Sequence, residues 1–198
     1  MTGFVRFDRL LIAGLVAAAV AAWPMAAVGD AHPRPPKVPT EVAVPDGNKL
    51  FLEAHAVGVQ IYSCNATATG YGWTLVAPRA NLYDRHGKLI ITHFAGPTWQ
   101  AKDGSKVVGA RVNGVNVDPT AIDWLLLSAT PTAPGPHGRG TLADTSFIQR
   151  LNTTGGRPPA AANCNATTVG TQAEVPYTAD YFFFRPRGCH GGAHRTES

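Results

Sequence analysis

Short runs of alternating apolar and polar residues, rich in β-branched and aromatic side chains, fill the chain from about residue 42 onward. Alternation with a period of two is typical of strands that bury one face. Glycine, proline, asparagine and aspartate interrupt these runs at short intervals. Strands are predicted in KLFLEAHAVGVQIYSC, GWTLVAP, RANLY, KLIITHF, PTWQA, SKVVGARV, WLLLSA, TLADTSFIQRLN and VPYTADYFFFRP, the last with Tyr177, Tyr181 and Phe183 on one face.

Three of the interruptions predict how consecutive strands are joined. Asp84–Gly87 predicts a hairpin turn in which Gly87 is free to take a positive φ. Asp103-Gly104 is the signal of a two-residue type I′ turn in the next hairpin. Gly96-Pro97 marks the break between the two hairpins.

The remaining segments add loops and little helix. Asp118 is placed to cap one helical turn that leads into the buried run WLLLSA, while APGPHGRG and TTGGRPPAAANCN read as loops. Closely spaced strands joined by turns predict an all-β, mainly antiparallel fold. We expect a sandwich or barrel-like single domain with long loops and at most a short helix.

The N-terminus has the layout of a secretory signal. Arg6 and Arg9 precede the apolar run Leu10–Ala22, and Trp23-Pro24 and small residues follow it. The run is shorter than the roughly 20 residues of a bilayer span. We therefore expect cleavage after Gly29, with Ala31 as the second choice, and no transmembrane segment in the mature chain. A retained membrane anchor is the alternative.

The rest of the chain divides by composition into three parts. Residues 30–41 are rich in proline without periodicity and predict an extended linker. A single β-rich domain is expected over residues 42–187, followed by a flexible tail over residues 188–198.

Composition and charge narrow the class of protein. Apolar residues make up 44% and charged residues 15%, with 21 glycines and 16 prolines, which favours a globular, turn-rich protein. The formal net charge of +4 comes from scattered lysines and arginines without a run. We therefore expect no nucleic-acid partner.

Three cysteines allow one disulfide and leave one thiol. The strings CNATATG, which starts at Cys64, and CNATTVG, which starts at Cys164, agree at most positions. They look like two similar strand ends that each lead into an Asn/Thr turn. The sequence thus predicts a Cys64–Cys164 bridge, and a chance recurrence of Ala/Thr-rich strings is the alternative.

Six stretches of the chain together resemble an uncharacterised family of secreted microbial proteins, the domain of unknown function 3455. The resemblance covers Val44 to Phe184 and implies a secreted single-domain protein, but it implies no catalytic residue. Its motifs are GVQIYSC, GWTLVAPRANLYD, HFAGPTWQAKDGSKVVG, IDWLLLSA, FIQRLNTTGGRPP and VPYTADYFFF.

The chain lacks the G-x-S-x-G, Walker, H-E-x-x-H and G-x-G-x-x-G signatures. His93 is the strongest single candidate for chemistry because it shares strand parity with Leu89 and Ile91 and should face the apolar side. It could bind a ligand or act as a general base oriented by Asp103 or Asp123. It could also be a core histidine bonded to its neighbours.

The candidate ligand-binding residues are Trp99, Trp73 and Arg150. Tryptophan rings could wall a pocket or stack on a sugar, although each also fits a β-core. The guanidinium of Arg150 could grip a carboxylate or phosphate, or it could pair internally with Asp144 or Asp123.

Two weak metal sites are conceivable at the ends of the chain. Cleavage after Gly29 would leave His32 in the third position of the mature chain, where Cu(II) or Ni(II) can bind an amine, two amides and an imidazole. The tail offers Cys189, His190 and His194.

Taken together, the sequence predicts a secreted or cell-envelope protein. The leading hypothesis is a non-catalytic binding or surface-associated module with an aromatic-lined pocket, whose partner is a small molecule or glycan. The alternatives are an extracellular enzyme that uses His93 with an aspartate as general base, and a purely structural cell-envelope protein.

Overall fold

The computed structural model describes residues 1, 3 and 34–188. The expected signal segment and first linker residues, including His32, lie outside the described residues apart from Met1 and Gly3. Cys189, His190 and His194 lie outside them as well. No helix in the described part of the chain is long and apolar enough to cross a membrane.

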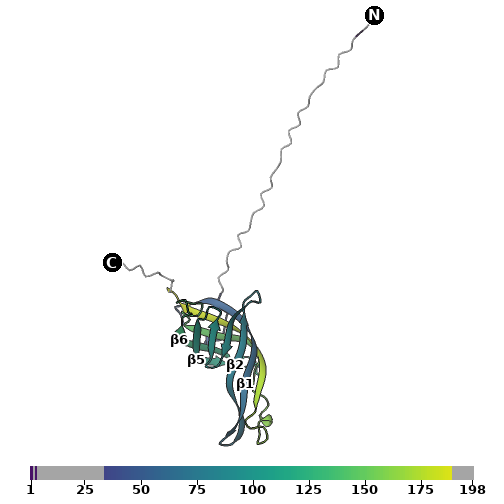
Figure 1. The fold of residues 1–198 in the computed structure, drawn as a ribbon, viewed down its shortest axis with the longest axis vertical. Helices are drawn as coiled ribbons and strands as arrows, with labels where there is room; N and C mark the ends of the chain where they lie inside the picture. The colour runs from purple at the N-terminus through teal and green to yellow at the C-terminus, as the bar shows by residue number, and fades with distance from the viewer. Residues whose placement is uncertain (2, 4–33, 189–198) are drawn as a thin grey trace, which may run out of the picture. The chain divides into compact units, whose positions relative to one another are not determined.

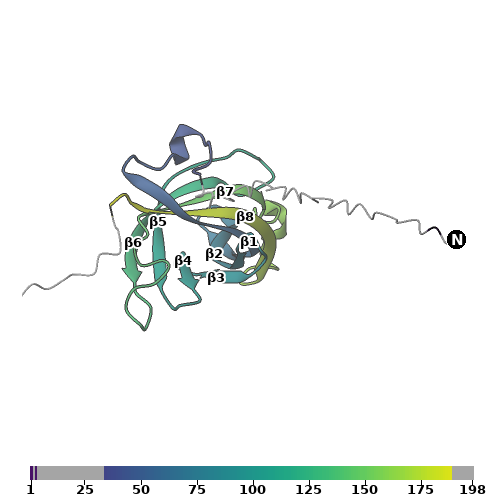
Figure 2. The same cartoon turned by 90° about the horizontal axis from the view of Figure 1, so that it is seen from above.

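Eight antiparallel strands form one closed barrel within residues 34–188. Each strand pairs with the next along the chain, and β1 pairs with β8 to close the ring (Figures 1 and 2). The predicted all-β, antiparallel, barrel-like class is therefore confirmed. The strands are β1 (Asn48–Thr67), β2 (Gly70–Tyr83), β3 (Leu89–Phe94), β4 (Thr98–Ala101), β5 (Lys106–Val115), β6 (Trp124–Ala133), β7 (Phe147–Gly155) and β8 (Gln172–Pro186).

The barrel interior follows from strict alternation along the strands. Ala54 and Ala56 of β1 point inward, as do Tyr177, Tyr181 and Phe183 of β8. Successive side chains of a strand lie on opposite faces, so the shared face predicted for the three β8 aromatics is the inner face of the barrel.

A second apolar cluster lies outside the barrel wall. Phe182 and Phe184 of β8 face outward, yet they are buried against Leu126 and Leu151. The segment before β1, with the short 3-10 helix η1 (Thr40–Val42), supplies the fully buried Val42 to this cluster. Both faces of β8 are thus covered here, which explains its continuous apolar run YFFF.

The two predicted hairpins form with the same kind of loop. Gly87 and Gly104 have φ of 76° and 84°, and each donates its N–H to the carbonyl three residues earlier. Asp103 is not among the residues with positive φ, so the two-residue type I′ turn predicted at Asp103-Gly104 was wrong. A three-residue loop with an αL glycine forms instead.

Two further expectations need adjustment. Asp118 does cap a turn, since its carboxylate accepts the N–H of Thr120, but the turn does not continue into a helix. The strand predicted from Thr141 begins only at Phe147. Residues 141–144 form turns that place Leu142 in the interior cluster at one end of the barrel.

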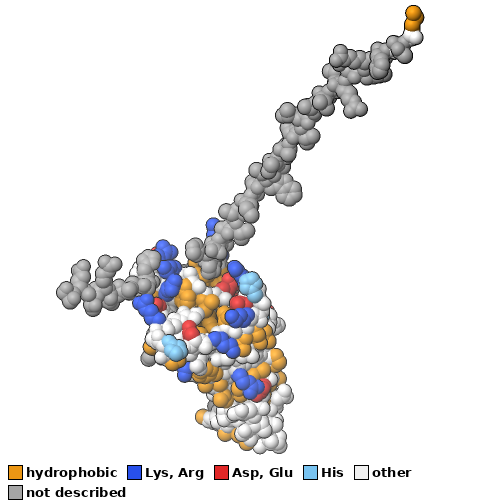
Figure 3. All heavy atoms as spheres, turned by 45° about the horizontal axis from the view of Figure 1, so that its top comes forward, with side chains coloured by type: hydrophobic (Ala, Val, Ile, Leu, Met, Phe, Trp, Pro, Cys, Tyr) orange, Lys and Arg blue, Asp and Glu red, His pale blue; other side chains and the backbone are white. Residues whose placement is uncertain are grey.

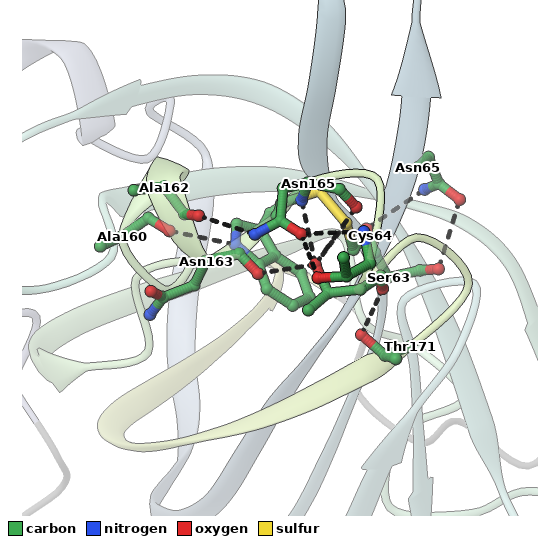
Figure 4. Close-up of a disulfide and its surroundings, with 12 residues drawn as sticks. Ser63, Cys64, Asn65, Ala160, Ala162, Asn163, Asn165 and Thr171 are labelled. Atoms are coloured by element: carbon green, nitrogen blue, oxygen red, sulfur yellow. Dashed lines mark hydrogen bonds between the residues drawn. A yellow bond between two sulfur atoms is a disulfide. The ribbon is translucent and has the colours of Figure 1, made fainter.

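The strands β1, β2 and β8 run on beyond the rest of the barrel (Figure 1). The Cys64–Cys164 disulfide lies on this extension and is confirmed as predicted (Figure 4). The backbone of Cys64 also bonds both Gly170 and Thr171. The loop from Arg157 to Thr171, which contains the 3-10 helix η2 (Ala161–Asn163), is therefore attached to β1 at two places.

Charges are mixed on the molecular surface. On the face drawn in Figure 3, lysine and arginine side chains are spread among acidic ones and do not gather in one patch. One exposed pair is Arg79–Glu174, at 2.6 Å. Exposed pairs of this kind contribute little to stability.

Replacing Cys64 and Cys164 by serine should lower the free energy of unfolding by about 4 kcal/mol, because the bridge spans a sequence separation of 100 residues. Urea denaturation followed by tryptophan fluorescence measures the change. Cys189→Ser, which leaves the bridge intact, is the control and should keep the wild-type midpoint. Equal midpoints for all three proteins would refute the prediction.

Candidate functional site

His93 and Trp99 stack face to face inside the barrel. They are cross-strand partners in β3 and β4, and their ring centroids are 4.2 Å apart with planes inclined by 8°. The turn between the strands contains Gly96, whose φ of 99° suits glycine. The Gly96-Pro97 break predicted from the sequence thus brings the two rings together.

Two tyrosines of β8 extend this aromatic pair. Tyr181 meets His93 and Trp99 edge to face, with centroid distances of 5.4 Å and 5.5 Å. Its hydroxyl lies 3.5 Å from that of Tyr177. Aromatic side chains from β3, β4 and β8 therefore form one wall, and edge-to-face contacts fix their orientation.

His93 is held in its neutral form. It is 3% exposed, and burial lowers the pKa of its imidazole to about 3, with the charge of Arg150 acting in the same direction. Its Nδ1 lies 2.9 Å from the carbonyl oxygen of Thr98, which only accepts hydrogen bonds. Nδ1 therefore carries the proton, and Nε2 is left as an acceptor.

Asp103 does not contact His93. Its carboxylate accepts hydrogen bonds from Ser105 in its own hairpin and from Thr141 in the loop that follows β6. Burial tends to raise the pKa of this carboxyl, but the hydrogen bonds outweigh burial and lower it. Asp103 thus joins two loops at the far end of β4 from His93.

Asp123 does not contact His93 either. Its carboxylate oxygens lie 3.4 Å from Arg111 and 3.1 Å from Asn116. The structure therefore forms neither of the histidine–aspartate pairs expected for a general base.

Arg150 lies in β7, opposite Leu125 of β6 and Tyr181 of β8. Its Nε and Nη2 donate to the backbone carbonyl of Asp123, at 3.1 Å and 2.9 Å. The expected internal pair thus involves the carbonyl of Asp123 and not its carboxylate. Among the described residues, Arg150 makes no salt bridge.

The positive charge of Arg150 reaches several interior groups. Burial raises the pKa of the phenols of Tyr62, Tyr177 and Tyr181, and the charge of Arg150 opposes this rise in all three. Arg150 also contributes to the lowered pKa of His93. The charge of Arg150 thus acts on all four rings, and its guanidinium is hydrogen-bonded to one of them, Tyr181.

Gln60 is an interior residue that the sequence did not single out. It lies on β1 with 2% of its surface exposed, and its Nε2 has no hydrogen-bond partner. The indole Nε1 of Trp99, which is 1% exposed, also lacks one. The alternation of Ala54, Ala56 and Gln60 along β1 was the signal that could have placed Gln60 inside.

Gly156 closes the site next to Gln60. A Cβ at this position would come within 2.8 Å of Tyr177 and 3.3 Å of Gln60, and its φ is 76°. Its carbonyl accepts the hydroxyl of Tyr62 at 2.7 Å. Only glycine fits this close approach of the chain to the interior residues.

The other expected aromatics lie elsewhere. Trp73 stands on the extended part of β2, where its indole donates to the carbonyl of Ala160 (Figure 4). Trp124 packs against the outer cluster beneath the N-terminal segment. Neither ring joins the wall formed by Trp99.

The structure gives no further support for a metal centre. Within residues 34–188, no group of three histidine, cysteine or acidic side chains could hold a metal ion. The lining of a groove outside the barrel includes Pro35, Pro36, Pro45, Gln149 and Arg187, and none of the predicted site residues lines it.

Residues 45–185 match the model of a family described as "Protein of unknown function (DUF3455)". No curated protein and no solved structure matches the chain.

The buried, neutral His93 should make stability depend on pH. The unfolded chain takes up a proton near pH 6.5, whereas folded His93 does so only near pH 3. The contribution is fully present above pH 6.5 and is lost as pH falls, by up to about 1.4 kcal/mol per pH unit.

Replacing His93 by glutamine removes this titration, while the contributions of the aspartates remain in both proteins. Between pH 7 and 4.5, the wild type should therefore lose about 2 kcal/mol more than His93→Gln in urea denaturation. His93→Phe, which tests the loss of the ring's hydrogen bond separately, should show the same slope as His93→Gln. Parallel slopes for wild type and both variants would contradict the prediction.

Proposed function

The chain belongs to the DUF3455 family, whose description names no activity, and we propose that it is a secreted, non-catalytic binding protein. Its ligand is a small molecule that binds inside the barrel, at the end that holds Gln60, His93 and Trp99.

The observation that carries this proposal is that two of the four buried side-chain atoms without a hydrogen-bond partner, the donors Gln60 Nε2 and Trp99 Nε1, belong to residues of the barrel interior. Buried polar groups in proteins are nearly always hydrogen-bonded, and each donor left unpaired costs about 1–3 kcal/mol. Two such donors on one aromatic-lined interior are explained by a ligand that carries hydrogen-bond acceptors.

The barrel architecture supports a binding role. An eight-stranded barrel has an interior that side chains just fill or that holds one small ligand. One end of this barrel is closed by apolar residues that include Leu142 and Phe183, and its other end collects polar groups. Polar side chains among aromatic walls are typical of small-molecule sites.

Binding is a better account of His93 than general-base catalysis. A general base works best when its pKa lies near the working pH, and the pKa of His93 is lowered to about 3. Neither Asp103 nor Asp123 is positioned to raise it. As a neutral ring stacked on Trp99, His93 instead offers a fixed acceptor and a flat surface.

Secretion is supported by two independent features. The N-terminal sequence has the layout of a signal segment. The Cys64–Cys164 bridge belongs to the class of structural disulfides that persist in oxidising compartments.

A ligand screen on the purified full chain tests the proposal. Thermal shift and tryptophan fluorescence are recorded with small organic acids, sugars, aromatic alcohols and amines. A ligand of this site should raise the melting temperature and change the Trp99 emission, and Trp99→Phe should weaken both effects. A ligand whose effects are the same in Trp99→Phe and wild type binds elsewhere.

Replacing Gln60 by methionine should separate a binding role from a structural one. Methionine has a similar length but no unpaired donor, so the ligand-free protein should gain about 1 kcal/mol in its free energy of unfolding. Ligand binding should weaken at the same time. If Gln60→Met instead destabilises the ligand-free protein, Gln60 supports the fold and the proposed function loses its main observation.

A further inference from the structure

We infer that the ligand of this site is an organic carboxylate whose acid group is bound by Arg150, with Arg157 as a second cation at the rim. This inference rests on the proposed function and adds the chemical class of the ligand.

The hydrogen bonds of Arg150 leave its charge uncompensated. Nε and Nη2 both donate to one neutral carbonyl, that of Asp123. A guanidinium has five N–H groups in a rigid fork that matches a carboxylate. These two N–H groups hold the side chain in place, and a further hydrogen bond links the guanidinium to the phenol of its cross-strand partner Tyr181. The donors that are left can bind a ligand.

Arg157 brings a second positive charge to the same end of the barrel. It follows Gly156 in the chain, and its Nη1 lies 3.4 Å from the carbonyl oxygen of Ala121. The charges of Arg150 and Arg157 both act to lower the pKa of the Tyr62 phenol. Both guanidiniums also bond the backbone of one short segment, Arg150 at Asp123 and Arg157 at Ala121. Gly156, the neighbour of Arg157 in the chain, accepts the hydroxyl of Tyr62.

No carboxylate among the described residues pairs with either arginine. The three recorded ion pairs are His55–Asp180, Arg79–Glu174 and Arg111–Asp123. Asp123 is the acidic residue nearest in the hydrogen-bond network, but its carboxylate bonds Arg111 and Asn116. Positive charge at this end thus lacks an internal counter-charge, which disfavours a cationic ligand.

The unpaired donors identify the same class. Gln60 Nε2 and Trp99 Nε1 are N–H donors without acceptors, and the guanidinium of Arg150 consists of N–H donors as well. A ligand for these groups must therefore supply acceptors. Charge-assisted bonds from guanidinium to carboxylate are about twice as strong as neutral ones. The aromatic side chains of Trp99, His93 and Tyr181 make this interior apolar, which suits an apolar body attached to the acid group.

Isothermal titration of the full chain with benzoate, benzamide and inorganic phosphate, at constant ionic strength, tests the inference. Benzoate should bind at least tenfold more tightly than benzamide, which has the same ring without the charge. Phosphate should bind more weakly than benzoate, because it lacks the apolar body. Equal affinity for benzoate and benzamide would overturn the inference while leaving the proposed function intact.

Three arginine variants localise the effect. Arg150→Gln should weaken benzoate binding at least tenfold, and Arg157→Gln, at an exposed position that the fold tolerates, should weaken it several-fold. Arg111→Gln removes the same charge from the neighbouring ion pair with Asp123 and should leave the affinity unchanged. Circular dichroism verifies that each variant is folded.

Two outcomes would refute the carboxylate ligand without refuting the proposed binding function. If Arg157→Gln and Arg111→Gln weaken benzoate binding equally, only general electrostatics is at work and the inference fails. If benzoate does not bind at millimolar concentration, the inference fails too. The proposed function is then tested separately, by the thermal-shift screen and by Gln60→Met.

Discussion

The pairing of β1 with β8 is the constraint on which the rest of the structure depends. It turns a linear series of hairpins into a closed ring, so that no strand of the barrel proper keeps a free edge. Closure also gives every strand an inner face. Each second residue is then directed into a confined space where its hydrogen bonds must be met by the protein or by a bound molecule.

The two ends of the barrel interior differ in how well their polar groups are hydrogen-bonded. The apolar end behaves as an ordinary core, with Leu82, Ile91 and Phe183 packed together. At the other end, His93 avoids the cost of a buried charge by staying neutral and bonding Thr98. Gln60 and Trp99 keep donors without partners there, and Arg150 keeps a charge that no carboxylate in the described part of the chain neutralises. Two further buried atoms without hydrogen-bond partners lie elsewhere: Gln149 Oε1 on the residue that lines the outer groove, and Arg185 Nε on the side chain that lies over the ring of Phe51. What distinguishes Gln60 and Trp99 is that their unpaired groups are donors inside the barrel, among aromatic side chains.

Much of the fold was predictable because its signals are local. Alternation gave the strands and the inner face of β8, glycines marked the hairpin loops at Gly87 and Gly104, and two similar strings gave the Cys64–Cys164 bridge. The turn type at Asp103 was missed because it depends on the backbone angle of one residue. One of the partners of the Asp103 carboxylate, Thr141, lies 38 residues further along the chain and is not visible in the local sequence of the turn.

The site was less accessible to sequence reasoning because distant residues form it. The contact of His93 with Trp99 follows from the single turn that joins β3 to β4. Gln60 and Gly156 meet only when the barrel closes, and they are far apart in the chain. Asp123 was a candidate partner for His93 or Arg150. Its carboxylate instead pairs with Arg111, and only its backbone carbonyl accepts hydrogen bonds from Arg150.

The disulfide also restricts the segment that forms the rim of the proposed site. The segment that begins with Gly156 and Arg157 runs to Thr171 and is attached to β1 through Cys164 and through the backbone bonds of Cys64. Its conformational freedom is reduced when the bridge forms, before any ligand arrives. For the proposed ligand, the rim is thus preorganised, and formation of the disulfide supplies an ordering that binding would otherwise have to impose.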